Sequence, residues 1–169
     1  MSALELLRSL FGYQAWANGD LLEKLDGLDP VGQAQELHNA IRLINHSYVV
    51  GRIFAAHLTG AQHGYASSNT AETPALPDLR AAVTASDKWY LDYLARVAPE
   101  DLVQRAAFRF TDGDQGSMSR QEMLMHVATH GGYHRGEVGR ILGQLSIMPP
   151  WDTFAVYLHH SDPARRHTA

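Results

Sequence analysis

Apolar residues recur every three or four positions in four long segments of the chain, which is the spacing of an amphipathic α-helix. A capping-box pattern, in which Ser119 is followed by Glu122, marks the start of the fourth segment, and glycine or proline follows each of the first three. The pattern predicts four helices, at about residues 2–25, 32–58, 77–97 and 119–145.

The connections between these helices indicate how they are arranged. Residues 61–77 are rich in small side chains, Thr and Pro, and show neither a helical nor a strand pattern. Antiparallel neighbours need only short loops, so this long link predicts that the second and third helices run parallel. We therefore expect an all-α, up-down-down-up four-helix bundle with a long crossover between helices 2 and 3.

Two smaller segments complete the predicted domain, which covers residues 1–169. Phe108 and Phe110 alternate with polar residues, and Asp112-Gly113 is a turn pair, so residues 103–118 are expected to form a short strand or hairpin. A short irregular tail is expected after the fourth helix.

Composition narrows the possible partners. The chain is 45% hydrophobic, and no apolar run approaches the roughly 18 to 20 residues of a membrane span. It shows no signal-peptide pattern and has a net charge of −4 without a basic patch, so we expect a cytoplasmic protein without nucleic-acid or membrane partners. Cysteine is absent, which excludes disulfides, thiolate nucleophiles and sulfur ligands.

Histidine is abundant, with ten in the chain, and three of them lie four residues apart on the fourth helix. A step of four residues turns about 40° and rises about 6 Å, so two such side chains can bind one metal ion. By the helical wheel, His130 and His134 lie near the centre of the apolar stripe, whereas His126 lies at its edge. We therefore predict His130 and His134 as ligands and a supporting role for His126.

The second helix offers a third ligand. His46 and His57 share one apolar stripe but lie roughly 16 Å apart along the axis, too far to share an ion bound at about 2.0–2.1 Å. His46 is the better candidate because its depth matches the middle of helix 4. The other histidines are expected to be solvated: His38, His63, His159, His160 and His167.

The alternative is that these three are hydrogen-bonded core histidines without a metal. Burying three imidazoles that share no partner costs a few kcal/mol of desolvation, which a common divalent ion removes. Other active-site patterns are missing: there is no G-x-S-x-G motif, no glycine-rich phosphate loop and no complete calcium loop.

Four glycines of helix 4 form a second face, about 180° from the histidines: Gly132, Gly136, Gly139 and Gly143. Each glycine costs up to about 1 kcal/mol relative to Ala inside a helix. We predict that this face packs closely against another helix, in the same chain or across a dimer.

Four motifs in order resemble the DinB family over nearly the whole chain: YQAWAN from Tyr13, LINHSYV around His46, HVATHGGYHRGEV from His126, and MPPWD from Met148. The resemblance implies a four-helix bundle, commonly dimeric, with nickel or zinc on three histidines that match His46, His130 and His134. Related families include transferases and isomerases that depend on low-molecular-weight thiols.

The leading functional hypothesis is a metal-dependent hydrolase or low-molecular-weight-thiol transferase that acts on a small molecule, with His126 and Tyr133 near the metal. The alternative is a non-catalytic stress-response protein in which the metal is structural or sensory; a third is a metal site that has lost its activity. A closed structural zinc site needs a fourth protein ligand, which the sequence does not show.

Overall fold

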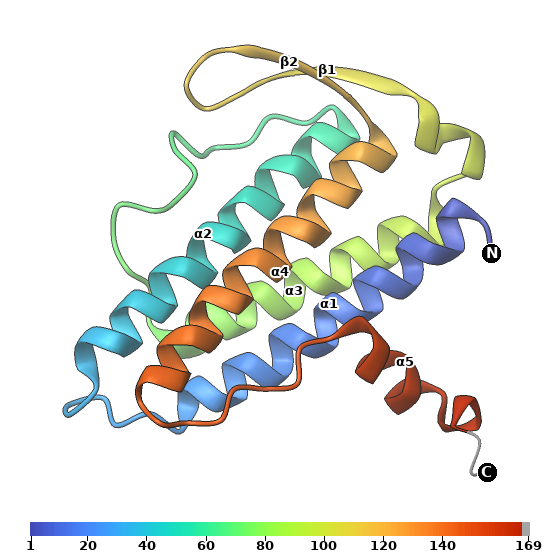
Figure 1. Ribbon diagram of the computed structural model, residues 1–169. Helices are drawn as coiled ribbons and strands as arrows, with labels where there is room; N and C mark the ends of the chain where they lie inside the picture. Colours follow the sequence, from blue (N-terminus) through green and yellow to red (C-terminus); the bar gives the residue numbers. More distant parts are fainter. Residues whose placement is uncertain (167–169) are drawn as a thin grey trace.

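The computed structural model describes residues 1–166 and shows a bundle of four long helices (Figure 1). Each boundary lies within two residues of its prediction. The helices are α1 (Ala3–Asp26), α2 (Ala34–Thr59), α3 (Leu76–Arg96) and α4 (Arg120–Gln144). Within the described residues, none of the helices combines the length and apolar character that crossing a membrane requires.

The predicted helix order is confirmed. α2 and α3 run in one direction and α1 and α4 in the other, and the α2–α3 connection returns along the length of the bundle (Figure 1). α2 packs against α3 and α4, and α1 packs against the same two helices. The bundle is therefore up-down-down-up, with α1 and α2 on opposite corners.

The hairpin before α4 is also present. A short 3-10 helix, η1 (Pro99–Val103), leads into β1 (Arg105–Arg109), which pairs antiparallel with β2 (Gln115–Ser119). Ser119 ends β2 and caps α4, because its hydroxyl accepts a hydrogen bond from the Glu122 backbone and the Glu122 carboxylate accepts one from the Ser119 backbone. The capping-box prediction is confirmed.

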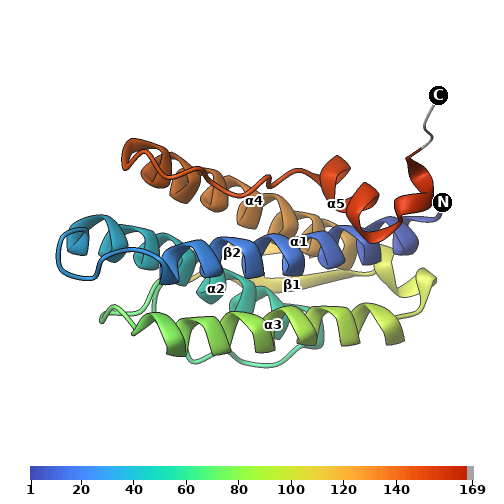
Figure 2. The ribbon, with the colours of Figure 1, turned by 90° about the horizontal axis from the view of Figure 1, so that it is seen from below.

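The prediction of an irregular tail is wrong. After α4 the chain turns back along α1 and forms α5 (Phe154–Ser161), followed by the short 3-10 helix η2 (Pro163–Arg165) (Figure 2). Tyr157 of α5 packs on two aromatic residues of α1, with ring centroids 6.1 Å from Tyr13 and 5.9 Å from Trp16. An eight-residue helix is too short to show a clear period, and it is these tertiary contacts that stabilise it.

The interior of the bundle has three levels. One apolar cluster includes Leu7, Phe54 and Leu124, and the other, at the opposite end, includes Leu25, Ile41 and Leu142. Between them every helix contributes polar side chains to a middle level, which we call the polar layer: Gln14 and Asn18, Asn45 and His46, Ser86 and Asp87, and His130, His134 and Arg135. Buried polar groups are costly unless they find partners, so this layer is where the sequence departs from a simple hydrophobic core.

Candidate metal centre

Three histidine rings meet in the polar layer. His130 and His134 are one turn apart on α4, and His46 reaches them from α2; the ring centroids are 4.4 to 5.0 Å apart. One ring nitrogen of each lies within 4.8 Å of the others, and the Nε2 atoms of His130 and His134 are 3.1 Å apart. Tetrahedral bonds of about 2.0–2.1 Å place ligand nitrogens roughly 3.3 Å apart. The cluster can therefore hold a metal ion.

Two of the rings are oriented by partners on their far side. The Ser68 carbonyl lies 2.7 Å from His46 Nδ1, and a Glu137 carboxylate oxygen lies 2.6 Å from His134 Nδ1. Because an oxygen of this kind accepts a hydrogen bond, it holds the proton on Nδ1 and leaves Nε2 free to bind a metal. Such partners fix both the tautomer and the angle of the ring.

The long α2–α3 connection supplies the Ser68 carbonyl and is fastened to α2 beside the site. Asn45, which is buried, donates to the Asn69 side chain at 2.5 Å, and Asn69 donates to the Arg42 carbonyl at 3.1 Å. The Arg42 guanidinium donates to the Thr70 carbonyl at 2.7 Å. The crossover is thus part of the site as well as a link between helices.

The electrostatics favour a neutral imidazole at His130. Burial, together with the neighbouring rings of His134, His46 and His126, lowers the pKa of His130 to about 4. Burial also lowers the pKa of His126. At neutral pH His130 therefore presents a lone pair without first having to lose a proton.

The position predicted for the histidines within α4 needs one correction. His130 and His134 are half-buried and lie at the side of the buried stripe, next to α2, and not at its centre. The buried stripe also includes Gly131 near its centre and Arg135 at its opposite edge, both of which an apolar wheel leaves out. Arg135 is only 5% exposed, so a charged residue is buried on this side of the helix.

The other predicted residues have distinct places. His126 stacks on His130, with centroids 5.3 Å apart, and Tyr133 meets the His134 ring edge-on at 5.1 Å while remaining 67% exposed. His57 lies outside the cluster and stacks on Phe108 of β1 at 4.6 Å.

The histidines expected to be solvated divide into several groups. His38 and His160 are exposed, whereas His159 is half-buried and His167 lies outside the described residues. For His63 the expectation is wrong, because its Nδ1 is buried and its ring packs 5.3 Å from His57.

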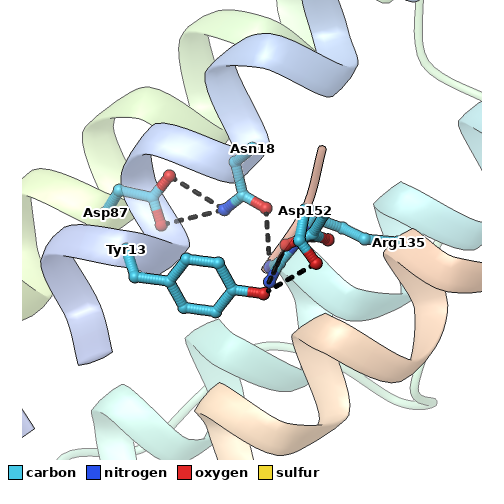
Figure 3. Close-up of polar contacts among 5 residues, drawn as sticks. All are labelled: Tyr13, Asn18, Asp87, Arg135 and Asp152. Atoms are coloured by element: carbon cyan, nitrogen blue, oxygen red, sulfur yellow. Dashed lines mark hydrogen bonds and ion pairs between the residues drawn. The ribbon is translucent and has the colours of Figure 1, made fainter. Parts of the chain in front are cut away.

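Behind the cluster, Arg135 joins three helices and the C-terminal segment (Figure 3). Its guanidinium pairs with Asp152 at 2.7 Å and donates to Asn18 at 3.2 Å, and Asn18 in turn donates to both carboxylate oxygens of Asp87 at 2.9 and 3.1 Å. The Tyr13 hydroxyl also donates to Asp152, and burial raises the pKa of Tyr13. The residue next to His134 is thereby held in place from α1 and from the segment before α5.

Sequence reasoning missed Glu137, Ser68 and Arg135. The spacing of His134 and Glu137, three residues apart on one helix face, is a usable signal for the first. Ser68 acts through its backbone, so no side-chain pattern identifies it.

The glycine face of α4 meets no helix within the described residues. A Cβ on Gly139 would contact Pro149 at 3.5 Å, in the segment after α4, and one on Gly136 would have no neighbour within 4 Å. Packing across a dimer remains a prediction.

Fold and site together define a helical-bundle protein with a three-histidine cluster able to hold a metal ion. The DinB family model matches residues 1–166, essentially the whole chain, and the protein belongs to the DinB family. No curated protein and no solved structure gives a significant match.

Proposed function

We propose that the protein is a metal-dependent enzyme that acts on a small molecule at the cluster of His46, His130 and His134, with zinc or nickel as the ion. The observation that carries the proposal is the donor set. Among the described residues, the cluster comprises three imidazoles and no carboxylate, whereas a closed structural zinc site normally has four protein ligands. Three neutral ligands leave one coordination position of the ion open and do not compensate its 2+ charge.

The reactions that fit are hydrolysis and transfer of a low-molecular-weight thiol. A divalent ion in such a site lowers the pKa of a bound water or thiol and so supplies a nucleophile at neutral pH. The chain's own residues set the geometry: Ser68 and Glu137 fix two of the rings, and Arg135 holds α4 against α1. Tyr133, largely exposed beside His134, is the side chain we assign to contact with the substrate.

The metal is tested first. Protein purified without added metal is analysed for bound elements, beside the His130→Ala variant and a His38→Ala control on the exposed face of α2. We expect one zinc or nickel per chain in the wild type and in the control, and a loss of most metal in His130→Ala. Full metal content in His130→Ala would refute the assignment.

Catalysis is tested on the metal-loaded protein. Thiol consumption is followed with a panel of low-molecular-weight thiols and electrophiles, and ester and amide hydrolysis is followed without thiol. We expect turnover in one arm that His130→Ala abolishes and His38→Ala retains. Stoichiometric metal without turnover in either arm would indicate the non-catalytic role instead.

A further inference from the structure

The polar layer encloses a cavity on the inner side of the metal centre. It offers about 30 Å³ to the centres of water-sized groups, and roughly 10–15 Å³ suffices for one. All four helices line it. Its polar wall includes Gln14, Asn18, Ser47, Ser86, Asp87, Arg135 and the His134 ring.

One hydrogen-bond acceptor in this wall lacks a partner. Gln14 is 7% exposed; its amide nitrogen lies 3.5 Å from an Asp87 oxygen, while its Oε1 finds no donor among residues 1–166. Gly131 of α4 makes room for this amide, because a Cβ there would lie 3.1 Å from Oε1. Because buried acceptors in proteins are normally hydrogen-bonded, we expect a bound molecule to donate to this oxygen.

The same wall contains a buried carboxylate that forms no salt bridge. Asp87 is 8% exposed, and its hydrogen-bond partners are the neutral amides of Asn18 and Gln14. No Lys or Arg in the described part of the chain forms a salt bridge with it. Burial raises the pKa of Asp87, because an uncompensated charge is costly in the interior. Arg135 lines the same cavity and its charge lowers the pKa of Asp87, but its guanidinium is paired with Asp152.

We propose that this cavity is a binding site for a primary ammonium group, which donates hydrogen bonds to Gln14 Oε1 and to the Asp87 carboxylate. A water molecule can donate hydrogen bonds but cannot balance the charge of Asp87, and Asp87 repels an anion. A small cation with N–H groups supplies both the hydrogen bonds and the positive charge. Since His134 shares the cavity wall, the ammonium belongs to the substrate of the metal centre; this extension rests on the proposed function.

Ligand binding is measured on the full chain with ammonium and methylammonium chloride as probes. Tetramethylammonium chloride, which has the charge but no N–H group, and sodium chloride serve as controls at equal ionic strength. We expect saturable shifts of the Gln14 side-chain amide in ¹H–¹⁵N spectra, and a rise in Tm, with the two donor cations alone. Asp87→Asn is expected to weaken binding by roughly tenfold or more, whereas Asp92→Asn, at an exposed position of the same helix, leaves it unchanged.

The proposal is overturned if wild-type protein shows no saturable response, or responds equally to tetramethylammonium. Should Asp87→Asn fail to fold, Gly131→Ala is the second variant: its Cβ crowds Oε1, and unchanged affinity would contradict the site. Bound metal is measured in the same samples. An ammonium response in protein that binds no metal supports this site and refutes the metal centre. Bound metal without an ammonium response supports the metal centre and refutes this site.

Discussion

Glu137 is the side chain whose removal tests most directly whether the cluster is built to hold a metal. Its carboxylate accepts from His134 Nδ1 at 2.6 Å, and the two side chains are 33% and 13% exposed respectively. Glu137→Ala removes both the hydrogen bond and the charge that orient the ring. Glu137→Gln keeps an acceptor oxygen in nearly the same place and removes the charge alone.

The size of the effect follows from the exposure of the pair. Loss of a partner that orients a metal-bound histidine costs about 10- to 100-fold in metal affinity, or roughly 1.4 to 2.7 kcal/mol. Because solvent reaches a third of the Glu137 side chain, part of its charge is screened, and the lower half of that range applies. We expect about 10- to 30-fold weaker binding for Glu137→Ala and a smaller loss for Glu137→Gln.

The assay is competition for zinc against a chelator indicator, with apo-protein prepared in parallel for each variant. Glu23→Gln, an exposed carboxylate on α1, which carries none of the three histidines, is the matched control and should bind as the wild type does. Affinities of both Glu137 variants within twofold of wild type would show that the His134 ring is held by packing alone, and would refute the reasoning.

Three further outcomes are expected. Asp152→Asn leaves Arg135 buried without an anionic partner and should lower the free energy of unfolding by about 2 to 4 kcal/mol in urea titrations; a change below about 0.5 would contradict the network. In metal-free protein the lowered pKa of His130 means that the unfolded chain binds more protons between about pH 4 and 6.5, so stability falls on acidification, by about 1 to 2 kcal/mol after solvent screening. His130→Asn should remove that part of the pH dependence. Gly136→Ala should stabilise the monomer by up to about 1 kcal/mol, and Gly136→Leu should dissociate the predicted homodimer in light-scattering measurements; an unchanged mass would exclude this face from the interface.

The parts of the fold that the sequence predicts are those governed by local rules. Helix limits follow from periodicity and capping, as at Ser119 and Glu122, and the parallel pair follows from the length of one connection. α5 is different, because its eight residues depend on aromatic contacts with Tyr13 and Trp16 that only the assembled bundle creates.

The residues of the candidate site likewise fall into a group that the sequence predicts and a group that it does not. His46, His130 and His134 can be singled out because helical spacing places each on a definite face at a definite depth. Their supports cannot, since Ser68 contributes a carbonyl from an irregular segment and Arg135 is buried only because Asn18 and Asp152 pair with it. An apolar wheel leaves out Gly131 and Arg135, and so it placed the buried face of α4 too close to the histidines.

The three histidines come from two helices separated by about half of the chain. An ion on the α4 pair that also takes His46 closes a long loop, and so restricts the unfolded chain as a disulfide would. His130 and His134 lie on one helix, so the cross-link between distant parts of the chain depends on His46. A bound ion would therefore give this chain, which has no cysteine, a cross-link that a chelator or mild acid could remove.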